Sequence, residues 1–156
     1  MILALVRELA SYEREPDAVT ATESDLDSAL FGAQPAIFAL IAEHDGTVAG
    51  FALWFLNFST WVGRHGVYLE DLYVRPEFRG HGYGRELLTE LATIADARGY
   101  GRVEWSVLDW NEPAHNFYES LGAVPMKEWT TWRLTADVLP KVAGRFGPTQ
   151  DAGGRA

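Results

Sequence analysis

Apolar residues near the start of the chain recur with the period of a helix. The stripe over residues 2–9 predicts a first helix that ends near Tyr12, with Pro16 closing it. Thr22-Glu23-Ser24-Asp25 has the order of a capping start and predicts a second helix, which Gly32 is placed to stop. The chain is therefore expected to begin with two short helices.

Strand signals follow these helices. Residues 36–43 and 48–57 are apolar runs joined by His44-Asp45-Gly46-Thr47, which is a typical hairpin signal. Residues 67–74 are a further run of strand formers, ended by Arg75-Pro76. The middle of the chain is therefore predicted to form a sheet.

The remainder of the chain alternates between helix and strand. Apolar residues recur on one helical face over 87–95, which predicts a long helix that reaches about Arg98. The later elements are expected to be a strand at 103–108, a helix through Tyr118 stopped by Gly122, and a strand pair at 123–127 and 130–135.

Length and composition agree with one compact domain. The 156 residues are 47% hydrophobic, enough for a real core, so we expect a single domain over 1–146 and a mobile glycine-rich tail at 147–156. No apolar run approaches the roughly 20 residues of a membrane-spanning helix, and no signal segment appears, so we expect a cytoplasmic protein that does not bind membranes.

The side chains that usually hold metals are scarce. The absence of cysteine excludes disulfides, thiolate metal sites and cysteine nucleophiles. The four histidines have no ligand-like spacing, so we expect scattered surface or loop histidines and no metal.

The net charge of −9 bears on the partners of the protein. Nucleic-acid-binding proteins usually carry a basic face, so this charge argues against that class. An acidic field would attract a cationic amine, although it can also serve solubility alone. Arg75, Arg79 and Arg85 are clustered in the sequence and could reverse the sign of the field locally.

A glycine-rich loop, Arg79-Gly80-His81-Gly82-Tyr83-Gly84, stands between the strand at 67–74 and the long helix. Glycine lets the backbone approach a ligand closely, and the first amides of a helix have no partner inside it. Together with the helix dipole, these amides predict an anion site suited to a pyrophosphate. A tight turn without a ligand is the alternative for such a loop taken alone.

Two common phosphate-binding loops do not fit this one. The dinucleotide fingerprint needs a glycine where Arg85 stands, and the loop of nucleotide hydrolases ends in Gly-Lys-Ser/Thr, which is absent. The spacing of Arg79, Gly82 and Gly84 instead resembles the Arg/Gln-x-x-Gly-x-Gly/Ala loop of the GNAT N-acetyltransferases, which depend on acetyl-CoA.

A second motif follows the strand at 103–108. Asn111 is a plausible helix N-cap, Pro113 suits the first turn, and Asn116-Phe117-Tyr118 precedes Gly122. This order resembles the N-x-x-x-x-N-F-Y-x-x-x-G segment that closes the CoA cleft in the same superfamily.

Three further segments narrow the resemblance. Tyr68-Leu69-Glu70-Asp71, Trp110-Asn111-Glu112-Pro113 and Trp132-Arg133-Leu134 resemble the spermidine/spermine (diamine) acetyltransferases and their thialysine-acetylating relatives. Residues 9–13 resemble the first helix of that subfamily, so the match extends over about 3–139.

The resemblance implies the GNAT fold. This is an α/β (α+β) fold whose mixed, mostly antiparallel central sheet is flanked by helices and splayed at the cofactor cleft. GNAT folds begin with a strand before the first helix, whereas this chain starts at the helix. We therefore expect the first family strand to be missing, because a short piece precedes this start or because the true start lies upstream. An exposed sheet edge would follow, with lower stability or a neighbouring chain that compensates.

Amine acetylation sets the chemistry that the site must supply. A primary ammonium has a pKa of about 10.4, so at neutral pH the enzyme needs a proton acceptor on the amine side. It also needs an acid for the departing thiolate, and no covalent enzyme intermediate is required. The resemblance implies that Glu70 is the acceptor and Tyr118 the acid. Their alternatives are a strand-edge carboxylate paired to an arginine and a core aromatic beside Phe117.

Glu70 and Asp71 are neighbours in an apolar strand, which is itself informative. Strict alternation puts one carboxylate on each face, Glu70 with Tyr68 and Asp71 with Leu69. Both cannot be buried cheaply, so we expect a bulge or an opening of the cleft at this point.

The resemblance also supplies the binding residues. Tyr12, Glu13, Glu70 and Asp71 are expected to bind the amine. The residues expected to bind acetyl-CoA are Leu72, Tyr73, Val74, Arg79, Gly80, His81, Gly82, Tyr83, Gly84, Arg85, Asn111 and Pro113. Among these, the amides of 72–74 are expected to polarise the thioester carbonyl.

The identity of the small-molecule amine stays open. Diamine acetylators carry an acidic residue two positions before the tryptophan of Trp132-Arg133-Leu134; here that position is Thr130, with Glu128 nearby. A polyamine, thialysine or another lysine-like amine fits this pattern. Acetylation of a protein or peptide amine and a non-catalytic acyl-CoA-binding module are the alternative functions. The resembled subfamily forms homodimers, which implies a homodimer here.

Overall fold

The computed structural model describes residues 1–145, and the chain divides into two compact units. The first unit is Met1–Asp109, and the described part of the second is 110–145. The single domain expected over 1–146 stays a prediction, and the tail expected at 147–156 lies outside the described residues.

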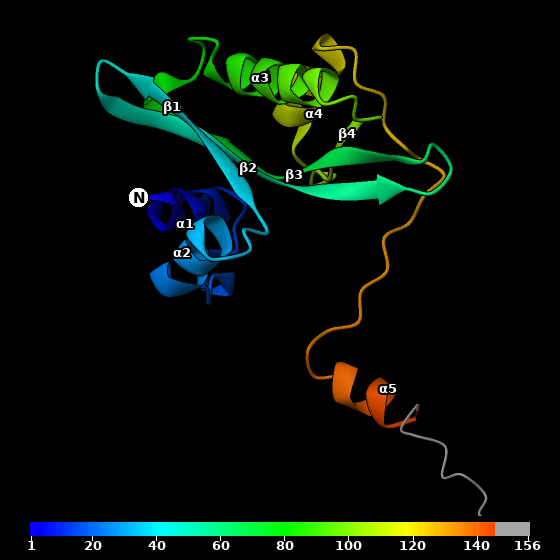
Figure 1. The fold of residues 1–156 in the computed structure, drawn as a ribbon. Coiled ribbons are helices and arrows are strands. Elements are labelled where there is room, and N and C mark those ends of the chain that lie inside the picture. Colours follow the sequence, from blue (N-terminus) through cyan, green and yellow to red (C-terminus); the bar gives the residue numbers. More distant parts are fainter. Residues whose placement is uncertain (146–156) are drawn as a thin grey trace, which may run out of the picture. The chain divides into compact units, whose positions relative to one another are not determined.

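The first unit is built on a four-stranded sheet in the order β1-β2-β3-β4 (Figure 1). Its strands are β1 (Phe38–His44), β2 (Thr47–Ser59), β3 (Arg64–Val74) and β4 (Val103–Trp105). The ladders β1–β2 and β2–β3 are antiparallel, and β3–β4 is parallel. The mixed, mostly antiparallel sheet of the expected fold is confirmed, although β4 is shorter than the predicted strand.

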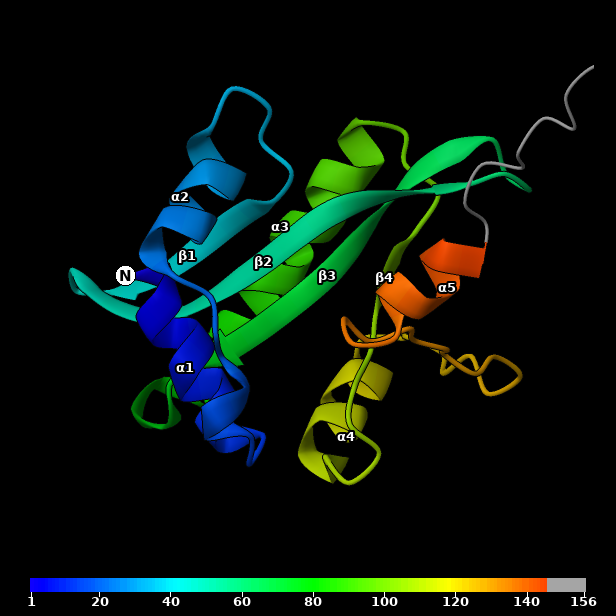
Figure 2. The same cartoon turned by 90° about the horizontal axis from the view of Figure 1, so that it is seen from below.

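Helices cover both faces of this sheet. Figure 2 shows α1 (Ile2–Tyr12) and α2 (Glu23–Phe31) on one face and α3 (Tyr83–Ala97) on the other. Short 3-10 turns at Pro16–Ala18 and Pro76–Phe78 connect the elements. The predicted positions of all three helices are confirmed.

The apolar stripes of α1 and α3 form the core. Leu5 and Leu9 of α1 pack with Phe51, Leu53 and Tyr73 of the sheet. Leu5 and Phe51 are fully buried, and burying each such side chain stabilises the fold by about 1.5–3 kcal/mol. On the opposite face, α3 buries Leu87, Leu88, Leu91 and Ala95. The sheet is therefore fixed between two helical layers.

Local signals in the sequence define the turns. The N–H of Asp25 donates to Thr22 Oγ1 over 3.2 Å, and the N–H of Thr22 donates to Asp25 Oδ2 over 2.8 Å, so the predicted capping box is confirmed. Asp45 and Gly46 both have positive φ, 48° and 77°, as a two-residue hairpin turn requires.

In the described residues, β1 lies at the edge of the sheet. Within residues 1–145, β2 is the only strand paired with β1, so the exposed edge expected from the sequence is confirmed. Among the same residues, no helix is both long enough and apolar enough to cross a membrane.

The second unit contains α4 (Glu112–Ser120) and α5 (Leu139–Arg145). Asn111 occupies the N-cap position of α4 as predicted, although its side chain makes no capping hydrogen bond. Gly122 has φ 86° just beyond the end of the helix, which confirms the predicted stop.

The strand pair predicted at 123–127 and 130–135 is wrong. The described structure has turns and irregular backbone over both segments. The apolar side chains of this region stay exposed, Trp132 by 92%, and the others are Val124, Met126, Trp129 and Leu134. Strand formers alone do not make a strand, because a strand also needs a paired neighbour and a face to bury.

Candidate active site

A β-bulge lies at the predicted amine site. The ladder between β2 and β3 pairs Leu53 with Asp71 and Trp54 with Leu69, so Glu70 is an extra residue without a partner on β2. The predicted bulge is confirmed. An extra residue interrupts the alternation of side chains, so Asp71 does not share a face with Leu69 as strict alternation suggested.

The bulge places Asp71 on the face of the sheet that α1 covers. Asp71 is paired with Leu53, and directly opposed residues in a ladder share a face. Leu53 packs in the cluster with Leu5 and Leu9 of α1. Asp71 is therefore a half-buried carboxyl at the edge of an apolar layer, whereas Glu70 is exposed.

The electrostatics of the bulge separate the two carboxyls. Burial, followed by the charges of Glu70 and Glu13, raises the pKa of Asp71 to about 6. Burial also raises the pKa of Glu13. Removing water and adding neighbouring negative charges both disfavour the ionised form. Asp71 therefore changes protonation close to neutral pH, a property that reasoning from the sequence did not identify.

The end of α1 brings Tyr12 and Glu13 to this region. Arg14 has a positive φ of 68°, and the N–H of Glu15 turns back to the carbonyl of Ala10, which ends the helix at this point. Tyr12 packs against the core cluster, and the charge of Glu13 acts on Asp71. The structure thus brings together Glu13, Glu70 and Asp71 from the predicted amine set.

The sheet is open beside these residues. The ladder between β3 and β4 pairs only 67–69 with 103–105, while β3 continues to Val74. In the described residues, the segment 70–74 therefore has a strand on one side only. This is the expected splay, and it leaves one edge of 72–74 available for a ligand.

The glycine loop has the backbone that an anion site needs. Gly80 and Gly82 have φ 81° and 93°, and a Cβ added at either would meet no atom within 4 Å. Gly82 is the N-cap of α3, so the amides of the next residues have no acceptor inside the helix. Left-handed glycines with open space beside them, at the start of a helix, fit the pyrophosphate of acetyl-CoA.

Arg79 connects this loop to the end of α1. Its guanidinium carbon lies 4.7 Å from the centroid of the Tyr12 ring and 5.9 Å from that of Tyr73. Its Nε donates to the carbonyl of Val74 over 3.0 Å. A predicted cofactor residue therefore contacts a predicted amine residue, which places the two halves of the site next to each other.

Arg75 has a different role from the one the sequence suggested. It forms a two-pronged ion pair with Glu8, with distances of 2.8 and 2.7 Å, and donates to the carbonyl of Val48. Its charge is therefore largely compensated by Glu8, and the pair fastens α1 to the start of the loop. Of the three clustered arginines, Arg79 and Arg85 stay as candidates to attract an anion.

Two of the histidines gather at the loop, so the expectation of scattered histidines is wrong for them. Nδ1 of His44 is 2.5 Å from the hydroxyl of Tyr83, and the rings of His44 and His81 are 5.8 Å apart. Residues far apart in sequence form this group, so spacing alone gave no signal of it. Within residues 1–145, no three His, Asp or Glu side chains gather in a group that could hold a metal ion.

The remaining predicted residues belong to the second unit. Asn111 is buried, and Pro113 lies in the first turn of α4. Tyr118 lies near the end of α4, with its ring centroid 5.3 Å from that of Phe117. The catalytic role of Tyr118 stays a prediction, as do the cofactor contacts of Asn111 and Pro113.

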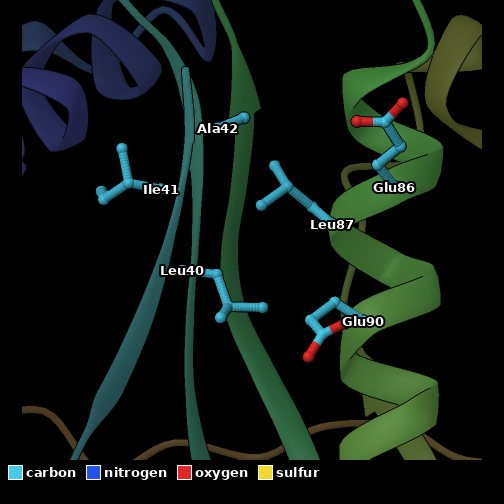
Figure 3. Close-up of a pocket in the computed structure, with 6 residues that line it drawn as sticks. All are labelled: Leu40, Ile41, Ala42, Glu86, Leu87 and Glu90. Atoms are coloured by element: carbon cyan, nitrogen blue, oxygen red, sulfur yellow. The ribbon is translucent and has the colours of Figure 1, made fainter. Parts of the chain in front are cut away.

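A cavity of about 240 Å³ lies elsewhere in the first unit, between β1 and α3. Figure 3 shows the side chains that line it, with two glutamates of α3 beside apolar residues of β1. Its lining consists of Leu40, Ile41, Ala42, Glu86, Leu87 and Glu90. None of these is a predicted site residue.

Comparisons with known proteins agree with the geometry. Residues 3–123 match the acetyltransferase (GNAT) family. The chain is 37% identical to the thialysine N-epsilon-acetyltransferase of Bos taurus, over 92% of this chain and 91% of that protein. It is 34% identical to the spermidine/spermine N(1)-acetyltransferase-like protein 1 of Homo sapiens, over 85% of this chain and 20% of that protein.

A solved structure is also similar. An integron cassette protein from the mobile metagenome of V. cholerae superposes with a TM-score of 0.76 at 30% identity, covering 91% of this chain and 89% of that one. The resemblance to the thialysine and spermidine/spermine subfamily is thus confirmed.

Proposed function

We propose that this chain, which belongs to the GNAT family of acetyltransferases, transfers the acetyl group of acetyl-CoA directly to the terminal primary amine of a small, lysine-like molecule. The observation that carries the proposal is the half-buried Asp71, with Glu13 and Glu70 near it, next to a loop shaped for a pyrophosphate. A cytoplasmic location, expected from the sequence, and a homodimer, implied by the resemblance, belong to the same proposal.

The cofactor side is served mainly by backbone. The amides that follow Gly82 would hold the pyrophosphate, with Arg79 and Arg85 adding positive charge. The open edge of 72–74 would hold the acyl end and donate to its carbonyl oxygen. When bound, acetyl-CoA supplies the acetyl group and a thiolate leaving group.

The amine side is served by carboxylates. Glu13, Glu70 and Asp71 would attract the substrate ammonium, which in turn would favour the ionised form of Asp71. The ionised carboxylate of Asp71 is then suited to accept the ammonium proton, because its pKa of about 6 places it near the operating pH. Glu70 is exposed on the bulge and stays the second candidate for this step.

The acid on the leaving-group side is assigned to Tyr118. A tyrosine hydroxyl, with an ordinary pKa of about 10, is protonated at neutral pH and able to donate. By the resemblance, Tyr118 stands at the position in the second motif that the family uses for this acid. Donation from Tyr118 to the sulfur would release CoA as the thiol as the C–S bond breaks, and the second proton that the nitrogen loses on forming the amide would restore the Tyr118 hydroxyl. The transfer would then be complete without a covalent enzyme intermediate.

The sequence around Thr130 favours one terminal ammonium over a long polycation. Diamine acetylators have an acidic residue at this position, and the neutral threonine removes one anionic contact. The acidic residues of the candidate site are instead gathered at the bulge and the end of α1. Thialysine, lysine or a similar amine matches a single cluster of negative charge better than spermidine does.

A panel of acceptors tests the proposed function. Purified protein and acetyl-CoA are mixed with thialysine, lysine, spermidine and a lysine-containing peptide, and the released thiol is measured. We expect kcat/KM to be highest for thialysine or lysine, with the acetyl group found on the terminal amine. Preference for the peptide would replace the proposed substrate class, and absence of thiol release with every acceptor would favour a non-catalytic acyl-CoA-binding module.

A further inference from the structure

The end of β1 contacts the glycine loop through His44. This residue is the last of β1, immediately before the hairpin turn. Its Nδ1 lies 2.5 Å from the hydroxyl of Tyr83, which is the first residue of α3 and stands between Gly82 and Gly84. A side chain from the hairpin is therefore bonded to the middle of the candidate anion site.

The other large side chains of the loop region gather at the same histidine. The ring of His44 is 5.5 Å from that of Phe78, 5.8 Å from that of His81 and 5.9 Å from that of Tyr83. His81 is in turn stacked on Tyr83, with centroids 6.3 Å apart. His44 is thus the common contact of the side chains that flank the glycines.

Asp45 lies next to the other ring nitrogen of His44. Its Oδ2 is 3.8 Å from Nε2, which is longer than a hydrogen bond. The hydrogen bond of His44 joins Nδ1 and the Tyr83 hydroxyl, and the tautomer of the imidazole sets which of the two atoms donates. The exposed carboxylate of Asp45 and the rings of His81 and Tyr83 are the polar groups that face the imidazole.

The loop needs such a support because glycine has no side chain to pack. Gly80 and Gly82 have positive φ in the structure, and a free glycine chain samples many other conformations. Ordering the loop at the moment of binding would cost affinity, and ordering it beforehand removes that cost. The contacts of His44 restrain Tyr83, whose backbone continues directly into the amides of the anion site.

We propose that His44 is a positioning residue for the phosphates of acetyl-CoA, because it holds Tyr83 and hence the glycine loop in the conformation that binds them. His44 itself is not proposed to touch the cofactor. The inference rests on the proposed function, since it takes the glycine loop as the acetyl-CoA site.

Calorimetric titration with CoA tests the inference. The variants distinguish the hydrogen bond between His44 and Tyr83 from the packing of the His44 ring. His44→Phe keeps an aromatic ring but loses the bond, and we expect the Kd for CoA to rise about tenfold. Tyr83→Phe should have a similar effect, and the double variant should be little worse than either single one, because both remove the same bond. His44→Asn retains a polar atom near the Nδ1 position and should recover most of the affinity.

Two controls distinguish positioning from a general loss of structure. His65→Phe changes a histidine that also contacts aromatic rings, those of Phe58 and Tyr100, and should leave the Kd unchanged. S-acetylpantetheine lacks the pyrophosphate, so its kcat/KM should be the same in His44→Phe and the wild type. If His44→Phe does not fold, Tyr83→Phe and His44→Asn carry the same comparison.

Other outcomes overturn the inference. Unchanged Kd values for CoA in His44→Phe and Tyr83→Phe, or equal losses with acetyl-CoA and S-acetylpantetheine, would show that His44 does not position the phosphates. These results differ from a failure of the proposed function, which the wild type itself would show by releasing no thiol with any small amine or by not binding CoA.

Discussion

The amine side and the cofactor side of the candidate site are built by different physical means. On the amine side, a bulge in β3 and the end of α1 hold three carboxyls, and the strongest effect is the raised pKa of Asp71. On the cofactor side, a loop with two left-handed glycines presents backbone amides at the start of α3. Charge and burial dominate the first region, whereas backbone conformation dominates the second.

This difference teaches where each region is vulnerable. The carboxyls are attached to a strand and a helix end, so substitutions there are expected to change protonation and charge while the fold persists. The glycine loop has few side chains of its own and depends on contacts from Tyr12, Tyr73 and His44. Substitutions in the loop are expected to change binding through the backbone.

The largest effect is expected for Gly82→Val, which disfavours the backbone conformation of the loop. A Cβ at φ 93° is strained and would also occupy the open space where the phosphates are proposed to lie. We expect the affinity for acetyl-CoA to fall by about 100-fold or more, measured by calorimetric titration. Gly63→Val is the matched control, because Gly63 also has positive φ and open space but lies in the turn before β3. If Gly82→Val and the wild type bind acetyl-CoA with equal affinity, the loop is not part of the cofactor site.

A large effect on turnover is expected for Tyr118→Phe, which leaves both compared regions intact. Loss of the acid should lower kcat by about 10²-fold or more, while the KM for acetyl-CoA changes far less. Steady-state kinetics at saturating amine measure this change. Phe117→Leu serves as the control for packing, since the two rings are neighbours. If Tyr118→Phe has the kcat of the wild type, Tyr118 is not the acid and has a structural role only.

The pH dependence of kcat/KM for the amine distinguishes the roles of Asp71 and Glu70 on the amine side. In the free enzyme, burial and neighbouring charge raise the pKa of Asp71 to about 6, so activity should fall as pH decreases through about 6. Asp71→Asn should lose this fall in activity at low pH and lower kcat/KM by about 10²-fold. Glu70→Gln should keep the same fall in activity at low pH but have a higher KM for the amine. If the fall in activity at low pH disappears only in Glu70→Gln, Glu70 is the proton acceptor and Asp71 a binding group.

The smallest expected effect concerns stability. Because the folded pKa of Asp71 is raised above its ordinary value of 3.8, folding favours the protonated form. The stabilisation is full below pH 3.8 and is lost as pH rises through about 6. Asp71→Asn cannot ionise, so at pH 7 it should be more stable than the wild type, by at most about 3 kcal/mol. Denaturant unfolding at pH 4 and pH 7 measures this gain, and an equal difference at both pH values would contradict it.

The sequence by itself determined the local elements and the family. The helical stripe of α1, the capping box of α2 and the Asp45-Gly46 turn are all local signals, and each formed as predicted. The glycine loop was recognisable because its resemblance to the GNAT loop depends on residue type at fixed spacing. The bulge at Glu70 was also predictable, since two adjacent carboxylates conflict with an apolar strand.

The tertiary structure decided which charges matter. The pairing of Arg75 with Glu8, the gathering of His44 with Tyr83 and the burial of Asp71 all depend on residues from distant elements. A pKa is set by burial and by charges nearby in space, which the order of residues does not give. The strand pair predicted after α4 was wrong for the same reason. Its residues favour strands, but a ladder and a buried face come only from neighbours in the folded chain.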